Sequence, residues 1–187
     1  MKKFLIISGS TKNDSLNEYI GKKIQSELNL KGFETKLINI NNLVFDPVLE
    51  QNNKNIDSII NQAQQDIMWA DEIVINYPLW WGYMPAKLKG FFDKTLLPGF
   101  AYIEDYKNNK TIKLLENKNL SIISTSGEST EGIYKSINDS DFQIIKGALC
   151  DFTGMKLKYA CRMGLVYKTN KEQKDVELNN FISKITQ

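Results

Sequence analysis

Short apolar runs and longer amphipathic stretches alternate along this chain from one end to the other. Apolar or alternating runs of about four to eight residues are typical of β-strands, and runs that are apolar throughout are typical of strands buried on both faces of a parallel sheet. These runs predict five strands, at Phe4–Ser8, Thr35–Ile40, Glu72–Tyr77, Asn119–Thr125 and near Leu157–Cys161.

Stretches whose apolar residues recur with the period of an α-helix separate these strands. They predict helices at Leu16–Leu30, at Ile56–Ala70, from Pro85 through Phe92, around Phe142–Phe152 and near Asp175–Ile185. Ser15 precedes the first helix and Glu18 follows three residues later, which predicts a capping box. Pro85 is expected at the first position of the third helix, where its missing N–H costs no hydrogen bond.

The connections between these elements give no sign of a domain boundary, because the chain has no internal repeat, no linker and no shift in composition. Gln51–Asn55 and Lys107–Lys110 are expected to be solvated loops, and Gly99–Leu114 is expected to hold a hairpin built on Phe100–Tyr102. The alternation predicts an α/β fold. We expect a flavodoxin-like, doubly wound, five-stranded parallel sheet of order 2-1-3-4-5 with helices on both faces, in a single domain over residues 1–187.

Composition and charge exclude several classes of protein. The chain has 187 residues, of which 42% are hydrophobic and 25% are charged, as in globular rather than disordered proteins. Its formal net charge of +2 is too small to predict nucleic-acid binding. No apolar run approaches the roughly 18 residues of a membrane span, so membrane insertion is not expected. The apolar run after Met1–Lys3 is too short for a signal peptide.

Three residue types refine this reading. Cys150 and Cys161 lack the spacing of a metal site and make no disulfide framework, which favours a reducing, cytoplasmic location. Arg162, the only arginine, is compatible with a phosphate contact, but one basic residue at a strand end predicts no site. The chain has no histidine, so imidazole acid–base catalysis and histidine metal sites are excluded, and no metal site is predicted.

The loop after the first strand, Ser8–Asn17, is rich in hydroxyl groups and leads into a helix N-terminus. In sheets of this topology ligands bind beyond the carboxyl ends of the strands, and a helix N-terminus favours an anion. The loop lacks the glycine spacing of dinucleotide folds and the Gly-Lys-Ser/Thr ending of a P-loop. It therefore fits a single terminal phosphate, as in a mononucleotide, although an ordinary capped helix after a polar loop would contain similar residues.

The loop after the third strand, Tyr77–Pro85, is almost entirely apolar, although loops are usually polar and exposed. Such a loop must bury itself against a flat ring ligand, a partner subunit or the protein's own core. The adjacent Trp80 and Trp81 suit the edge of a planar heterocycle.

The loop after the fourth strand, Ser124–Gly132, consists mainly of small and polar residues. Small side chains let backbone N–H groups approach a ligand, and Gly127 supplies permissive dihedral angles. These N–H groups would be able to stabilise negative charge on a bound ring. A Ser/Thr/Gly turn is also common without any ligand.

Two segments, Tyr77–Asp93 and Pro98–Tyr102, resemble the NAD(P)H:quinone oxidoreductase family of the flavodoxin-like proteins. Ser15–Asn17 and Thr125–Gly127 fall where the flavin-phosphate and ring loops of that family lie, so the resemblance extends over nearly the whole chain. It implies a flavin-binding domain, a homodimer, and hydride transfer from NAD(P)H to flavin and then to a quinone-like, nitro or azo acceptor.

The resemblance also assigns roles by position. The implied flavin-binding residues are Ser10, Ser15, Leu16 and Asn17 around the phosphate, Pro78, Leu79, Trp80, Trp81 and Gly82 along the ring edge, and Thr125, Ser126, Gly127, Glu128 and Tyr134 around the pyrimidine end of the ring. Of these, Tyr134, Gly127 and Glu128 are the candidate catalytic residues, the last two through backbone N–H groups that stabilise negative charge. Trp81 and Tyr102 are the candidate substrate-binding residues, and Tyr102 would close the site of the neighbouring subunit.

The chain departs from this family at two points. Well-studied members carry a histidine at the position of Ser10 and another a short way beyond that of Tyr134, and this chain has neither. Longer members have a C-terminal extension that supplies contacts to the adenine of FAD. This chain ends after its fifth predicted helix, which favours FMN over FAD.

The leading hypothesis is an FMN-dependent enzyme, an NAD(P)H dehydrogenase of the quinone type that uses NAD(P)H as co-substrate. Two alternatives are a flavin-binding ancillary subunit that regulates a cation-efflux transporter and a flavodoxin-like electron carrier. True flavodoxins are typically strongly acidic, whereas this chain has a net charge of +2 and a pI of about 8.3, which argues against the carrier. Nothing in the sequence excludes a transporter partner.

Overall fold

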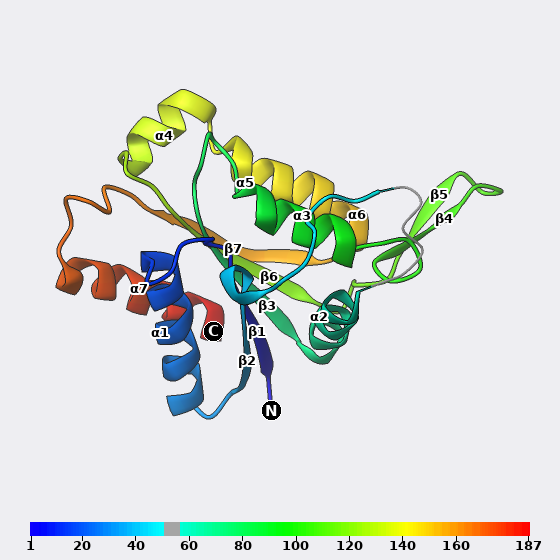
Figure 1. Cartoon of the computed structure of the whole chain (residues 1–187), viewed down its shortest axis with the longest axis horizontal. Coiled ribbons are helices and arrows are strands. Elements are labelled where there is room, and N and C mark those ends of the chain that lie inside the picture. The colour runs from blue at the N-terminus through cyan, green and yellow to red at the C-terminus, as the bar shows by residue number, and fades with distance from the viewer. Residues whose placement is uncertain (51–56) are drawn as a thin grey trace.

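Five parallel strands form one sheet at the centre of the molecule (Figure 1). The computed structural model describes residues 1–50 and 57–187. The strands of the sheet are β1 (Lys3–Ser8), β2 (Glu34–Asn39), β3 (Glu72–Pro78), β6 (Asn119–Thr125) and β7 (Lys156–Met163). They lie in the order β2-β1-β3-β6-β7, which is 2-1-3-4-5 when only the strands of this sheet are counted. The predicted fold class and strand order are therefore confirmed.

Helices cover both faces of this sheet (Figure 1). The first face carries α1 (Leu16–Leu30) and α7 (Lys171–Thr186). The second face carries α2 (Ser58–Trp69), α3 (Ala86–Thr95) and a continuous helical run from Ser140 to Thr153. That run consists of α5 (Ser140–Ile144), a π-helical segment (Ile145–Cys150) and α6 (Asp151–Thr153).

Alternate residues of β1 belong to two separate cores. Phe4 and Ile6 pack with residues of α1 and α7, whereas Leu5 and Ile7 pack with residues of α2 and α3. Successive side chains of a strand point to opposite faces of the sheet, so a strand covered on both faces is apolar at most of its positions. This two-sided burial fixes where the strands end, and therefore where the loops that follow them begin.

The starts of the helices lie close to their predicted positions, with two corrections. Ser15 caps α1, because its side chain accepts a hydrogen bond from the N–H of Glu18. The predicted capping box is only half formed, since the Glu18 carboxylate accepts from the N–H of Asp14 instead of that of Ser15. Pro85 lies at the N-cap of α3 and not at its first helical position.

Two helices in the described residues are not predicted from the sequence, a 3-10 helix at Ile40–Asn42 and the α-helix α4 (Thr130–Ile137). Helix α4 has only eight residues, and its first turn contains Gly132. Glycine is typical of loops, so the sequence of this turn predicts a continuation of the preceding loop. The predicted hairpin exists but lies further along the chain, with strands β4 (Tyr102–Asp105) and β5 (Lys110–Lys113). The predicted loop Gln51–Asn55 lies outside the described residues.

None of the helices in residues 1–50 and 57–187 is both long enough and apolar enough to cross a bilayer.

Gly90 on α3 shows how closely one connection packs on the second face of the sheet. A Cβ atom built on Gly90 would lie 2.2 Å from the carbonyl oxygen of Pro47 and 2.5 Å from its Cβ atom. A side chain at this position would force either α3 or the segment around Pro47 to move. The glycine in the Lys-Gly-Phe-Phe stretch is therefore explained by packing.

We expect Gly90→Ala to lower the free energy of unfolding by about 1–3 kcal/mol, as overpacked cores do. Gly147→Ala is the matched control, because a Cβ atom there would meet nothing within 4 Å. The control should leave stability unchanged or raise it by up to about 1 kcal/mol, since alanine is the better helix former. Urea unfolding followed by far-UV circular dichroism measures both, and equal stabilities for the two variants would contradict the packing argument.

Candidate functional site

The loops that follow β1, β3 and β6 leave the sheet side by side. These strands are adjacent and parallel, so their carboxyl ends meet at one edge. The pairing continues past the strand ends, since the N–H of Gly9 donates to the carbonyl oxygen of Asn76 at 2.7 Å. In the same way, the N–H of Leu79 donates to the carbonyl oxygen of Thr125 at 2.8 Å. These hydrogen bonds hold the starts of the loops in register.

A cavity of about 260 Å³ lies where the loops meet. Seven residues that the sequence assigns to cofactor binding line it, namely Ser10, Ser15, Leu16, Asn17, Pro78, Trp80 and Thr125. Four further residues complete the lining, namely Lys12, Val166, Tyr167 and Lys174. The structure therefore gathers half of the predicted cofactor residues, from three separate loops, around one cavity.

One end of the cavity has the features of an anion site. It lies at the N-terminus of α1, where backbone N–H groups and the helix dipole favour negative charge. The hydroxyls of Ser10 and Ser15 line it, and the side chains of Lys12 and Lys174 bring positive charge from two different elements. Ser10 also shapes the loop, because its Oγ accepts a hydrogen bond from the N–H of Lys12 at 3.2 Å. These groups fit a terminal phosphate.

Asn17 is a buried polar residue of the cavity wall. Its Oδ1 accepts a hydrogen bond from Thr125 Oγ1 at 3.1 Å, and its carbonyl oxygen accepts one from Ser8 Oγ at 2.9 Å. Its Nδ2 has no hydrogen-bond partner among the described residues, although the atom is buried. A buried donor without a partner costs about 1–3 kcal/mol, so this amide is available to a ligand that carries an acceptor.

The loop after β3 makes a tight turn whose tip points away from the core. Trp80 and Tyr83 exchange two backbone hydrogen bonds of 2.8 and 3.0 Å across Trp81 and Gly82. Both of these central residues have positive φ, 52° and 79°, as in a type I′ turn, and Gly82 adopts it without strain. Trp81 is fully exposed, and neither it nor Leu79 nor Gly82 lines the cavity.

The loop after β6 packs against the segment that follows β7. The N–H of Val166 donates to the carbonyl oxygen of Ser126, and the N–H of Leu165 donates to that of Glu128, both at 3.1 Å. A Cβ atom on Gly127 would lie 3.1 Å from the ring of Tyr167. The ring of Tyr167 therefore lies beside the glycine, and Tyr167 also lines the cavity. Gly127 and Glu128 are themselves exposed next to the cavity.

The side chain of Glu128 has a structural role. Its carboxylate accepts a hydrogen bond from the N–H of Ser129 at 2.6 Å, just before α4. This backbone hydrogen bond, together with one from the Ser129 hydroxyl, lowers the pKa of Glu128 below its ordinary value. The carboxylate is therefore ionised at neutral pH, and any role of Glu128 toward a ring belongs to its backbone N–H.

Tyr134 does not line the cavity. It lies on α4 and is 55% exposed. The helix lies against the turn after β3, because a Cβ atom on Gly82 would lie 3.8 Å from the side chain of Ile137. The structure thus places Tyr134 on an element beside the predicted ring-edge loop but not in the cavity wall.

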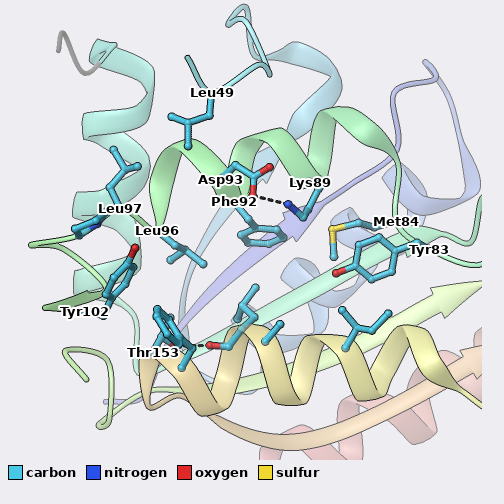
Figure 2. Close-up of a pocket in the computed structure, with 15 residues that line it drawn as sticks. Leu49, Tyr83, Met84, Lys89, Phe92, Asp93, Leu96, Leu97, Tyr102 and Thr153 are labelled. Carbon is cyan, nitrogen blue, oxygen red and sulfur yellow. Dashed lines mark hydrogen bonds and ion pairs between the residues drawn. The ribbon is translucent and has the colours of Figure 1, made fainter. Parts of the chain in front are cut away.

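Tyr102 lies in a different groove, of about 500 Å³, between α3 and the helical run Ser140–Thr153 (Figure 2). Its ring packs edge-on against Phe152, with 4.6 Å between the ring centroids. Figure 2 shows Tyr83, Met84, Phe92 and Leu96 around the same groove. Within one chain Tyr102 is therefore separate from the cavity, and its predicted contact with a neighbouring subunit stays a prediction.

The remaining chemistry-bearing residues are committed to the fold. The guanidinium of Arg162 bonds to Asp139 and Asp141, at 2.6 and 2.7 Å, so its side chain serves the fold and not a phosphate. Burial raises the pKa of the Cys150 and Cys161 thiols to about 12. Both thiols are therefore protonated at neutral pH and are weak nucleophiles.

Sequence reasoning missed the residues contributed by the chain after β7, namely Val166, Tyr167 and Lys174. Only the loops after the first, third and fourth strands of the sheet were expected to form the site. β7 pairs with β6 in parallel, so its carboxyl end lies at the same edge and delivers these residues. The order 2-1-3-4-5 contains this signal, because it already places the fifth strand next to the fourth.

The chain matches a family described as having the flavodoxin-like fold, over residues 2–185. It is 30% identical over 149 residues to a protein of Haemophilus influenzae named as an uncharacterised NAD(P)H oxidoreductase, which covers 74% of this chain and 73% of that protein.

Two solved structures share the fold across almost their whole length. One is an NAD(P)H:quinone oxidoreductase from Methanothermobacter marburgensis, with a TM-score of 0.77, 18% identity and coverage of 97% of this chain and 96% of that one. The other is an FMN-dependent NADH-azoreductase from Bacillus anthracis in complex with FMN, with a TM-score of 0.74, 16% identity and full coverage, 100%, of both chains. The family resemblance predicted from the sequence is confirmed, and the chain belongs to the family with the flavodoxin-like fold.

Proposed function

We propose that this protein is an FMN-dependent NAD(P)H oxidoreductase that passes a hydride from NAD(P)H to a quinone-like acceptor. The observation that carries the proposal is the cavity at the carboxyl edge of the sheet, with a helix N-terminus, two hydroxyls and two lysines at one end and Trp80 nearby. The names of the relatives support it, since they include an NAD(P)H oxidoreductase, a quinone oxidoreductase and an FMN-dependent azoreductase. When bound, FMN would supply the ring that accepts the hydride and then gives it up.

The anion end of the cavity supports FMN as the cofactor. Ser10, Ser15 and the N-terminus of α1 would hold the phosphate, and Lys12 and Lys174 would balance its charge. All of these groups line one cavity, which suits the single phosphate of a mononucleotide. The free Nδ2 of Asn17 offers a donor beside them.

The loop after β6 supports a role in stabilising negative charge. Within the described parts of the chain, no backbone acceptor is found for the N–H groups of Gly127 and Glu128. Both are exposed beside the cavity, where preorganised N–H groups would stabilise charge that develops on a ligand. Tyr134, on the neighbouring helix, would add a hydroxyl.

Among the described residues, no histidine or carboxylic acid lines the cavity to protonate the reduced acceptor. The chain contains no histidine, and among the residues that the structure describes, the ionisable side chains that line the cavity belong to Lys12, Tyr167 and Lys174. Hydride transfer depends more on the placement of the donor against the flavin ring than on an acid from the protein. The chain's residues therefore need only hold NAD(P)H or the acceptor beside the ring, one at a time. Protons would come from water.

The proposal is tested by adding FMN to the purified protein and following NAD(P)H oxidation with a soluble benzoquinone. We expect one FMN per chain, quenching of its fluorescence on binding, and parallel double-reciprocal lines, because both substrates use one cavity in turn. The rate should change little between about pH 6 and 8, since no imidazole titrates there. A protein that binds no flavin, or turnover with intersecting lines, would contradict the proposal.

Riboflavin and a lysine variant make this test specific for the phosphate. Riboflavin lacks the phosphate and should bind at least about tenfold more weakly, which is the usual size of a lost charge-assisted contact. Lys12→Gln should weaken FMN and leave riboflavin unchanged, whereas the exposed Lys107→Gln on the distant hairpin should alter neither. Equal binding of FMN and riboflavin would overturn the assignment of the anion end.

A second prediction concerns Gly127. We expect Gly127→Val to lower kcat by about 100-fold or more, because a side chain there blocks the close approach of the backbone to the ring. Tyr134→Phe should cost about tenfold or less, equal to about 1.4 kcal/mol, if the backbone N–H groups carry the charge. Steady-state kinetics at saturating FMN measures both effects.

The double variant Gly127→Val with Tyr167→Ala separates two causes of that loss, since a Cβ atom on Gly127 also approaches the Tyr167 ring at 3.1 Å. Recovery of activity in the double variant would mean that the valine acted by displacing Tyr167. Near-complete loss of activity in Tyr134→Phe, with FMN still bound, would mean that the tyrosine does the work of the histidine that this chain lacks.

A homodimer is the second part of the proposal. Phe91 and Phe92 add nothing to an exposed apolar surface, because both are buried in the chain's own core, where α3 packs on the sheet. The exposed apolar residues include Leu49, Ile144 and Phe152 around the groove of Figure 2 and Trp81 on the neighbouring turn. A second copy of the chain would cover this surface.

We expect light scattering at micromolar concentration to give twice the chain mass of 21.5 kDa. Phe152→Asp should shift the mass toward one chain, because it places a charge beside the groove that holds Tyr102. Tyr106→Asp, on the exposed hairpin turn, is the matched control and should leave the mass unchanged. A single-chain mass for the unmodified protein would reject the dimer.

A further inference from the structure

Arg162, the only arginine, lies near the end of β7 with its side chain buried. Its Nη1 donates to Asp139 Oδ1 at 2.6 Å and its Nη2 donates to Asp141 Oδ1 at 2.7 Å. The guanidinium also lies over the ring of Phe142, 4.7 Å from its centroid. One side chain thus joins the edge strand of the sheet to the carboxylate of Asp139 in the turn after α4 and to that of Asp141 in the first turn of α5.

Arg162 contacts the chain at both ends of α4. At the start of the helix, the hydroxyl of its first residue, Thr130, donates to the backbone carbonyl oxygen of Arg162 at 3.3 Å. After the helix, the residue that follows the C-cap Asn138 is Asp139, which the guanidinium holds. None of the residues of α4 is buried, and a helix of eight residues has little stability of its own. Its position therefore depends on these end contacts.

The turn after α4 needs such a contact. Asn138 and Asp139 both have left-handed backbone, with φ of 52° and 51°. A residue with this backbone conformation raises the free energy of the fold unless its surroundings hold it. The side chain of Asp139 accepts no capping hydrogen bond from the backbone of α5. Backbone hydrogen bonds from Phe142 and Gln143 to the carbonyl oxygen of Asp139 close this turn, and the bond from Arg162 to the Asp139 carboxylate ties it to β7.

The same network reaches the loop after β3. Asp141 Oδ2 accepts a hydrogen bond from the hydroxyl of Tyr77 at 3.4 Å, and Tyr77 directly precedes Pro78 in the cavity wall. Burial, with the negative charge of Asp141 nearby, raises the pKa of Tyr77, so the hydroxyl stays protonated and can donate. On the other side, Ile137 of α4 lies against the turn at Gly82.

We propose that Arg162 is a positioning residue for the reaction: through Asp139 and Thr130 it sets the place of α4, and so of Tyr134, beside the ring-edge loop. This inference rests on the proposed function. Buried ion pairs add little net stability, because desolvation offsets their attraction, whereas their fixed geometry can specify one arrangement. The side-chain hydrogen bonds of Arg162 within the described residues go to Asp139 and Asp141, neither of which lines the cavity.

The test compares Asp139→Gly with Asn138→Gly. Glycine tolerates the left-handed backbone at either position, so both variants gain the same flexibility. Only Asp139→Gly removes the carboxylate that Arg162 holds. Asp139→Asn is the conservative variant, since asparagine also tolerates this backbone and still offers Nη1 an oxygen. Asp139 is half-buried, so these variants are milder than a replacement of Arg162 itself.

Hydrogen exchange of the flavin-free protein reports the position of α4 without any activity. We expect exchange at residues 130–137 to be about tenfold faster in Asp139→Gly than in Asn138→Gly, with the sheet unchanged. Kinetics at saturating FMN should then show kcat lowered about tenfold in Asp139→Gly, with the dissociation constant for FMN within about threefold of the unmodified protein. Asp139→Asn should recover most of kcat.

The outcomes separate this proposal from the proposed function. If the two glycine variants exchange alike, the contact from Arg162 does not hold α4 and the proposal is wrong. If α4 loosens but kcat is unchanged, the contact is structural and the positioning role is wrong. If no variant, including the unmodified chain, binds FMN or oxidises NAD(P)H, the proposed function fails, while the exchange result still decides whether Arg162 holds the helix.

Discussion

The parallel pairing of β1, β3 and β6 is the constraint on which the rest of this structure depends. Each strand is apolar on both faces, so helices must cover both sides of the sheet and the register cannot slip without exposing a core. The register places Ser8 beside Asn76 and Pro78 beside Thr125. Three loops therefore start from fixed points at one edge, and the cavity between them is a consequence of strand pairing and not of any single motif.

The two ends of the sheet handle buried polar groups in opposite ways. At the amino end, the buried Glu72 bonds to Lys2 at 2.5 Å and to the hydroxyl of Ser121 at 2.6 Å, so its charge is fully paired. At the carboxyl end, Asn17, Asn76 and Ser124 each keep a buried atom without a partner among the described residues. Unpaired buried polar atoms reduce stability, and their concentration at one end marks that end as the place where a ligand completes the structure.

The site is completed by elements that are distant in the sequence and weakly held by the core. The segment after β7 brings Tyr167 and Lys174 to the cavity, and hydrogen bonds from Leu165 and Val166 fasten it to the loop after β6. Helix α4 has no buried residue and is held at its ends by one arginine. The part of the molecule next to the proposed ring is thus assembled from polar contacts, which can be adjusted without disturbing either core.

The sequence alone determined the sheet and its strand order, because two-sided burial and a capped helix leave strong local patterns, and its resemblance to a family supplied seven of the residues around the cavity. It did not determine α4, whose short length and Gly132 carry no strong pattern, or the role of Arg162, since neither of its carboxylate partners can be recognised from spacing. Only the tertiary structure showed that Trp81 is exposed while Phe91 and Phe92 are buried, although all lie in one apolar stretch. Local patterns specify which residues avoid water, but the packing of distant segments decides which of them the core can hold.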